Sequence, residues 1–120
     1  MLDIEIVPAV ARGKGRRRRG YMQLRPAPVD DNKVMIGETD MPQALQSHAV
    51  RAASEALDMH EGTDYKDVAY YIKNQFDKEY GTGWQCITGV SFGSYVTHSS
   101  GSFIHFCLGR LAIMLFKAAC

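Results

Sequence analysis

Histidine, cysteine and serine are the residue types in this sequence that could carry metal binding or nucleophilic catalysis. Four histidines are present, and none stands at the spacing from cysteine or a carboxylate that a zinc site requires. His98 and His105 flank an expected turn, where a packed, hydrogen-bonded pair across a hairpin is favoured over a metal site. The sequence therefore predicts no metal ligands and no cofactor.

A catalytic serine or a phosphate-binding loop is also not expected. Ser91 lies between Gly89 and Gly93, but no strand-to-helix turn, the setting that exposes a catalytic serine, is expected after it. No glycine-rich phosphate loop is present. Carboxylates fall on the solvated faces of the expected helices rather than in an apolar pocket. We therefore predict no catalytic residues and no enzymatic activity.

The strongest charge feature is the basic stretch at residues 12–20, which contains four consecutive arginines, Arg16–Arg19. Such a stretch is typical of a nuclear import signal, of a contact with nucleic-acid phosphates, or of a solvated tail with no dedicated partner. Tyr21 is the only aromatic residue nearby, which disfavours base stacking. Residues 1–32 are predicted to be a disordered basic tail. A nuclear or nucleic-acid adaptor acting through this tail is the alternative function.

The composition is that of one small internal protein. The 120 residues carry a net charge of +1 and are 46% hydrophobic, so the whole chain favours neither nucleic acid nor a membrane. No apolar run approaches the roughly 20 residues of a membrane span, and the start lacks a basic secretory leader. Three cysteines without paired spacing indicate reduced thiols. Cys86 and Cys107 are expected to pack as small apolar residues.

Periodicity predicts an α+β fold in which two helices pack on an antiparallel β-sheet. The first helix is expected to start with Asp40 as its cap and Pro42 in its first turn, and to end near Asp58. The second starts at Thr63 or Asp64 and ends before a glycine. Strands are expected at residues 33–38, 84–88, 92–98, 103–108 and 111–117.

The last expected strand also bears on oligomeric state. Residues 111–116 are apolar on both faces, whereas an antiparallel strand with one wet face alternates. The strand must therefore be covered twice, once by the helices and once by another element. In so short a chain we expect the second cover to be another copy, which makes the protein a homodimer.

A resemblance is carried by the segments at residues 76–80, 84–87, 92–98, 103–109 and 112–117. Together they are similar to the smallest class of cytoplasmic dynein light chains. The resemblance covers residues 33–118, with a slightly longer linker between the helices, and defines a domain at 33–120 after the tail at 1–32. Its most specific part is the heptapeptide Phe-Gly-Ser-Tyr-Val-Thr-His at residues 92–98.

The resemblance implies a non-catalytic, strand-swapped homodimer that binds extended segments of partner proteins by β-strand addition. Expected partners are the dynein intermediate chain and other proteins with Thr-Gln-Thr-like motifs, in the cytoplasm and on the cytoskeleton, with a nuclear fraction through the arginine run. The implied dimer-interface residues are Gln85, Phe92, Ser94, Val96 and Thr97. The implied groove residues are Lys66, Phe92, Gly93, Ser94, Tyr95, Val96, Thr97, His98, Phe103, His105, Ala112 and Met114.

Two of these positions have a physical reason of their own. Gly93 has no side chain, so a partner backbone could approach closely there. Lys66 lies in the expected first turn of the second helix, where free N–H groups at the positive end of the helix dipole could be capped by a partner glutamine.

The sequence departs from the family pattern at four positions. His105 and Cys107 stand where the family commonly has aromatic hydroxyls, which changes the expected preference for partner motifs. Ala118 replaces a serine that is phosphorylated in some relatives. Gln85 replaces an interface histidine, and glutamine does not titrate. We therefore predict a dimer that is less sensitive to mild acid; dissociation between pH 7 and pH 5 in sedimentation, with a midpoint near an ordinary histidine pKa, would contradict this.

Overall fold

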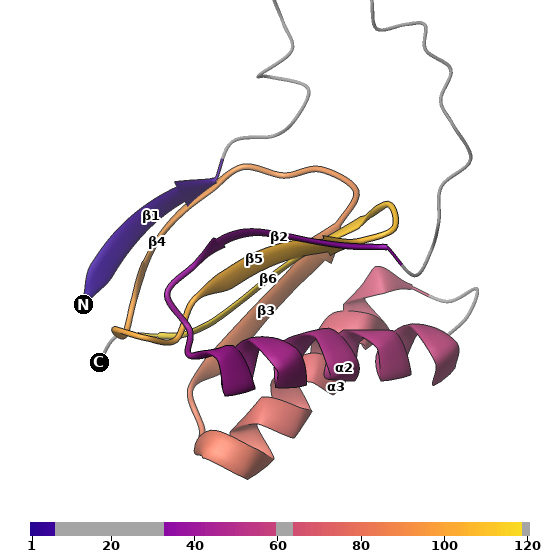
Figure 1. Cartoon of the computed structure of the whole chain (residues 1–120), viewed down its shortest axis with the longest axis horizontal. Helices are drawn as coiled ribbons and strands as arrows, with labels where there is room; N and C mark the ends of the chain where they lie inside the picture. Colours follow the sequence, from indigo (N-terminus) through magenta and orange to yellow (C-terminus); the bar gives the residue numbers. More distant parts are fainter. Residues whose placement is uncertain (7–32, 60–63, 119–120) are drawn as a thin grey trace, which may run out of the picture.

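A computed structural model describes residues 1–6, 33–59 and 64–118 of the chain. Four antiparallel strands form a sheet in the order β2-β5-β6-β3, and two helices cover one of its faces (Figure 1). The predicted α+β class is confirmed. The elements of this layer are β2 (Val34–Thr39), α2 (Gln43–Met59), α3 (Tyr65–Tyr80), β3 (Trp84–Gly89), β5 (Ile104–Leu108) and β6 (Leu111–Lys117).

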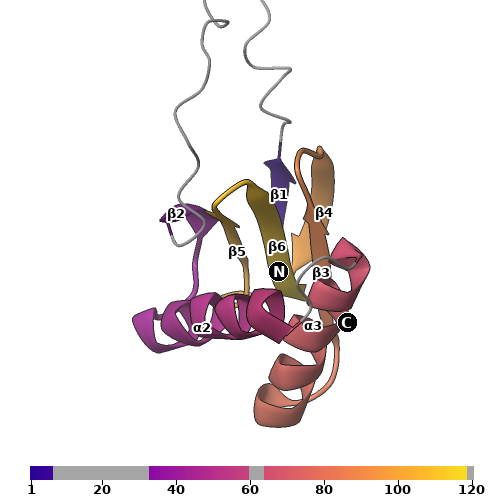
Figure 2. The same ribbon diagram turned by 90° about the vertical axis from the view of Figure 1, so that its right-hand side faces the viewer.

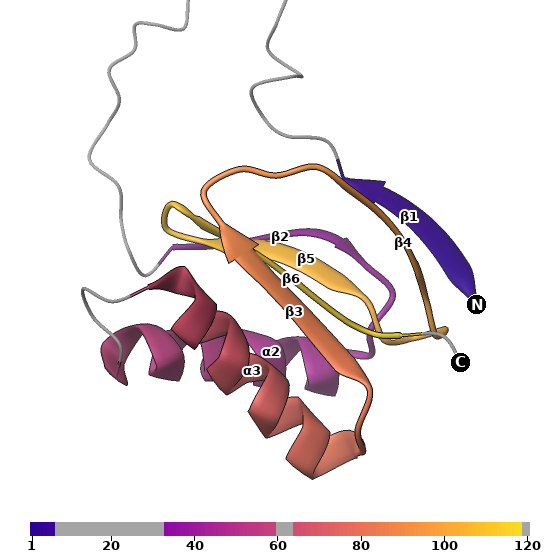
Figure 3. The same ribbon diagram turned by 180° about the vertical axis from the view of Figure 1, so that it is seen from behind.

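Two further strands, β1 (Leu2–Ile6) and β4 (Ser94–His98), pair with each other and not with the four-stranded sheet. We call this pair the β1–β4 ribbon. It lies over the face of the sheet that the helices leave open, as Figures 2 and 3 show from two directions. Strand β1 corrects the prediction of a tail disordered from Met1, because Leu2–Ile6 is regular structure. The remainder of the predicted tail, including Arg16–Arg19, lies outside the described residues.

The helical layer forms because both helices carry one apolar face. Helix α2 buries four alanines, whose small side chains let the helix approach its neighbours closely, and α3 buries larger side chains. Together with inward-facing residues of the sheet they form one core cluster. The buried helix residues are Ala49, Ala52, Ala53, Ala56, Val68, Ile72 and Phe76.

The start of α2 differs from the prediction. The Asp40 carboxylate does not cap the helix; it accepts hydrogen bonds from the backbone N–H groups of Gly101 at 2.8 Å and Phe103 at 2.9 Å. The first helical bonds run to the Pro42 carbonyl oxygen instead. Asp40 therefore fixes the connection between β4 and β5, and this holds Phe103 directly before β5.

Strand β6 is buried along its apolar length, as its sequence predicted. Leu111, Ile113 and Leu115 belong to the core cluster beneath the helices. Met114 and Phe116 belong to a second cluster that also contains residues of the β1–β4 ribbon. The second cover is therefore supplied by the same chain and not, as expected, by another copy, while the homodimer itself stays a prediction.

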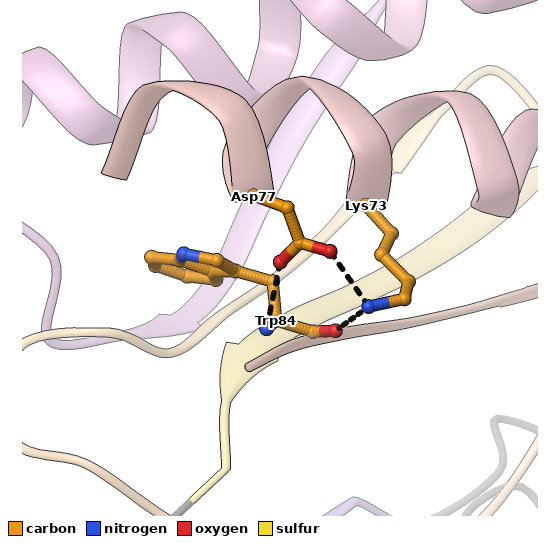
Figure 4. A network of polar contacts seen from close by, with 3 residues as sticks. All are labelled: Lys73, Asp77 and Trp84. Carbon is orange, nitrogen blue, oxygen red and sulfur yellow. Dashed lines mark hydrogen bonds and ion pairs between the residues drawn. The ribbon is translucent and has the colours of Figure 1, made fainter. Parts of the chain in front are cut away.

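A polar network joins α3 to the first residue of β3 (Figure 4). Lys73 Nζ donates to Asp77 Oδ2 and to the Trp84 carbonyl oxygen, both at 2.8 Å, and the Trp84 N–H donates to Asp77 Oδ1 at 3.1 Å. Partial desolvation raises the pKa of Asp77, but the Lys73 and Trp84 hydrogen bonds and the charges of Lys73 and Lys117 outweigh it and hold the pKa below its usual value. The network fixes the position of β3 at the open edge of the sheet.

Replacing Asp77 with asparagine is expected to lower the free energy of unfolding by about 1 kcal/mol at pH 7, because a partly exposed, charge-assisted bond is lost. A lowered folded-state pKa means that this stabilisation is present above the unfolded pKa and disappears as the pH falls through the folded one. Urea unfolding at pH 7 and pH 3 should therefore show the difference from wild type shrinking at pH 3. Glu79→Gln, an exposed change on the same helix, is the control; an equal Asp77→Asn effect at both pH values would contradict this role.

Candidate peptide-binding groove

The site is built around strand β4, whose side chains alternate between its two faces. Val96 is half-buried and His98 is buried against the sheet, whereas Tyr95 is 70% exposed and Thr97 is exposed. Ser94 also faces the sheet, and its Oγ donates to Met114 Sδ at 3.2 Å. One face of β4 therefore forms the wall of an apolar cluster, and the other is turned to solvent.

The floor of the site is the face of the sheet opposite the helices. Phe103, Met114 and Phe116 are buried there, and Phe92 and Val96 pack against them. The Phe103 and Phe116 rings stack with centroids 6.3 Å apart. The structure thus brings together Phe92, Val96, Phe103 and Met114, the four apolar groove residues that the sequence singled out.

The two histidines of the predicted site lie at opposite ends of this cluster. His98 Nδ1–H donates to the Ser99 carbonyl oxygen at 2.8 Å, and its ring lies 5.0 Å from that of Phe103. His105 lies opposite Met114 on β6, and its ring meets the edge of Phe92 at a centroid distance of 5.9 Å. The expected pairing of His98 with His105 is wrong, because β5 forms its hairpin with β6 rather than with β4.

The remaining predicted groove residues differ in their placement. Ala112 is buried on β6 next to the floor, opposite Cys107. Gly93 is exposed just before β4, and its φ is not positive, so its backbone does not require glycine. Lys66 lies apart from the ribbon, exposed on the first turn of α3, the helix that covers the other face of the sheet.

The start of α3 is nevertheless tied to the strand that leads to the site. Thr88 Oγ1 donates to the Tyr65 carbonyl oxygen at 2.7 Å, which joins the end of β3 to the first turn of the helix. Asp64 occupies the predicted cap position with an extended backbone, but its side chain makes no capping hydrogen bond. N–H groups of this turn are therefore left without a side-chain cap.

The predicted interface residues follow the two strands that flank the 90–93 loop. Gln85 is exposed on β3 opposite Phe116, on the face of the sheet that carries the ribbon. Phe92, Ser94 and Val96 are half-buried, and the Thr97 hydroxyl donates to the carboxylate of Asp3. The single chain thus places Gln85 on β3 and the other four residues on β4 or in the loop before it, and their role between two copies stays a prediction.

Sequence reasoning missed the residues of β1 that meet this site. Ile6 is 7% exposed within the apolar cluster, and Ile4 packs against the same cluster. Their signal was present as strict alternation of apolar and acidic residues over Leu2–Ile6, which is the pattern of a half-buried strand. Because the arginine run follows, residues 1–32 were predicted to form one disordered tail.

The nucleophile candidates lie in surroundings that do not activate them. Burial raises the pKa of both Cys86 and Cys107, which keeps these thiols protonated at neutral pH. Ser91 has glycines two residues away on each side, as in a nucleophile elbow, but it is exposed in a loop that leads into strand β4 and not into a helix. Cys120 lies outside the described residues.

The described ranges, 1–6, 33–59 and 64–118, contain neither a candidate metal site nor a candidate membrane-spanning helix. No group of three or more histidine, cysteine, aspartate or glutamate side chains is placed to hold a metal ion. No helix in these ranges is long and apolar enough to cross a membrane.

Comparison with known proteins places this geometry in a family. The solved dynein light chain-like domain of a Fasciola hepatica calcium-binding protein is 29% identical as a mercury derivative and 30% identical in its native form, with TM-scores of 0.61 and 0.63. In each case the match covers 78% of this chain and 100% of the other. The family model described as dynein light chain type 1 matches residues 33–118. The chain belongs to the dynein light chain family.

Proposed function

We propose that this protein is a non-catalytic, dimeric hub that binds extended segments of partner proteins by adding them as a strand to β4. Its family supports an adaptor that binds proteins. Thr-Gln-Thr-like motifs are the proposed ligands, and the dynein intermediate chain is the proposed partner in microtubule-based transport. On this proposal the protein acts in the cytoplasm and on the cytoskeleton.

The observation that carries this proposal is the position and pairing of β4. It lies outside the four-stranded sheet, and all five of its residues pair antiparallel with an extended segment. A strand in this position offers a row of N–H and C=O groups that an incoming chain can satisfy, while alternate side chains enter the apolar cluster below. Backbone pairing then supplies affinity, and the cluster supplies selectivity.

The dimer is proposed from the open edge of β3. Strands β3 and β4 are joined by only residues 90–93, yet they do not pair with each other as a hairpin would. We propose that β4 joins the β3 edge of a partner copy. Ile87 on β3 and Val90 in the loop support this arrangement, because both are exposed apolar residues that such a contact would cover.

Two features favour an extended ligand with a polar residue at its centre. Gly93 leaves space beside β4 for a partner backbone, and replacement by valine would fill it without backbone strain. The first turn of α3 lacks a side-chain cap, and a glutamine side chain is a suitable substitute. Lys66 in the same turn would add a positive charge near that glutamine.

Calorimetric titration of a Thr-Gln-Thr peptide, with the mass in solution measured in parallel, tests the proposal. We expect micromolar binding of one peptide per chain of a dimer. Two grooves on one dimer would then raise avidity for a bivalent partner by roughly 10²–10⁴. A variant without residues 12–20 should keep the same peptide affinity. A monomer, or a dimer indifferent to the peptide, would overturn the proposal.

A further inference from the structure

Strand β1 pairs with β4 in the way that the proposed function assigns to a segment of a partner protein. Its five residues pair antiparallel with β4, from Leu2 opposite His98 to Ile6 opposite Ser94. Ile4 lies opposite Val96, and residues directly opposite each other project to the same face of a sheet. Ile4 and Ile6 therefore enter the apolar cluster from the side that a bound segment would use.

Strand β1 makes the contacts expected of a peptide bound in the groove. Ile6 is 7% exposed and shares its cluster with Phe103, Met114 and Phe116. On the other face of the strand, Asp3 and Glu5 are exposed, and the Asp3 carboxylate accepts a hydrogen bond from the Thr97 hydroxyl. The segment thus combines two buried aliphatic side chains with acidic residues on its solvent side.

We propose that Leu2–Ile6 is an internal ligand of the groove, and that the groove selects extended segments with aliphatic residues at alternate positions and an acceptor opposite Thr97. This inference rests on the proposed function and adds to it the class of sequence that binds. Any partner segment must displace β1 from β4. The apparent affinity for a partner is then reduced by the fraction of molecules in which the groove is closed.

The test compares two full-length variants in titrations with the Thr-Gln-Thr peptide. Ile6→Asp places a charge against Phe103 and Met114 and should release β1, because an unpaired charge is not tolerated in an apolar cluster. Met59→Asp also places an aspartate at an apolar residue, but at the exposed end of α2, outside the ribbon and the groove. We expect Ile6→Asp to bind about tenfold more tightly than wild type and Met59→Asp to bind like wild type.

Hydrogen exchange gives a second measurement that does not depend on a substitution. In wild type, saturation with the Thr-Gln-Thr peptide should keep the amides of Ser94–His98 protected while those of Asp3–Ile6 lose their protection. Continued protection of β1 in the presence of bound peptide would show that the two segments use different sites. That result, or equal peptide affinity of wild type and Ile6→Asp, would overturn the internal ligand.

A peptide with the sequence of residues 1–10 separates this inference from the proposed function. It should bind Ile6→Asp in trans, and the same peptide carrying aspartate at its sixth position should not. If the Thr-Gln-Thr peptide binds no variant while the 1–10 peptide binds Ile6→Asp, the proposed motif fails and the internal ligand is supported. If the 1–10 peptide does not bind Ile6→Asp, the internal ligand is overturned whatever the other peptide does.

Discussion

Replacing Phe103 with alanine is expected to lower the free energy of unfolding by about 3–5 kcal/mol. Phe103 is 1% exposed and lies in ring contact with both His98 and Phe116, so its removal leaves a cavity where β4, β5 and β6 meet. Urea unfolding followed by circular dichroism measures the loss. Because small domains are stable by only about 5–15 kcal/mol, much of the total would disappear. A loss below about 1 kcal/mol would mean that the ribbon does not pack on the sheet as described.

Phe106 provides the matched control for a role of Phe103 in peptide binding. It is also fully buried, but it lies in the cluster beneath the helices rather than in the one beneath the ribbon. The milder Phe103→Leu and Phe106→Leu variants should both remain folded, and the two should lose comparable stability. Only Phe103→Leu should weaken peptide binding. Equal weakening by both would indicate a general loss of structure and no specific groove contact.

The sequence predicted the helical layer and the sheet because their signals are local. Residues 111–117 were expected to form a strand and do so, and the apolar faces of both helices are buried as their periodicity indicated. The end of α3 before Gly81, whose φ is +91°, follows from the preference of glycine for such a conformation. These features depend on neighbouring residues, so they could be derived without knowledge of the tertiary structure.

The errors concern contacts between residues far apart in the sequence. Asp40 is of a residue type that commonly caps helices. Its carboxylate instead accepts hydrogen bonds from N–H groups more than 60 residues later in the chain. The second cover of β6 was assigned to another copy because nothing local shows that Leu2–Ile6 returns to the sheet. For Phe103 and Met114, spacing alone could not decide between the core and the binding surface, because apolar residues are found in both.

The placement of the whole groove therefore depends on the pairing of β4. Proline substitution is expected to distinguish the roles of the two edges of this strand. Successive residues of an antiparallel strand direct their N–H and C=O groups to opposite edges, and proline removes the N–H. Tyr95→Pro and Val96→Pro thus each interrupt one edge. We expect one of these variants to remain dimeric with peptide affinity reduced at least about tenfold, a loss of about 1.4 kcal/mol in binding free energy.

The other proline variant is expected to lose the dimer, because it interrupts the edge of β4 that is proposed to join β3 of a partner copy. Sedimentation and calorimetric titration measure both effects, and Tyr95→Ala and Val96→Ala control for the side chains because they keep the N–H. Tyr95 is mostly exposed, so its alanine variant should behave like wild type. Retention of the dimer by both proline variants would contradict the joining of β4 to a partner copy, and unchanged behaviour of both would contradict strand addition at β4. The two edges of β4 would then have no part in recognition, and the ribbon would serve only to cover β6.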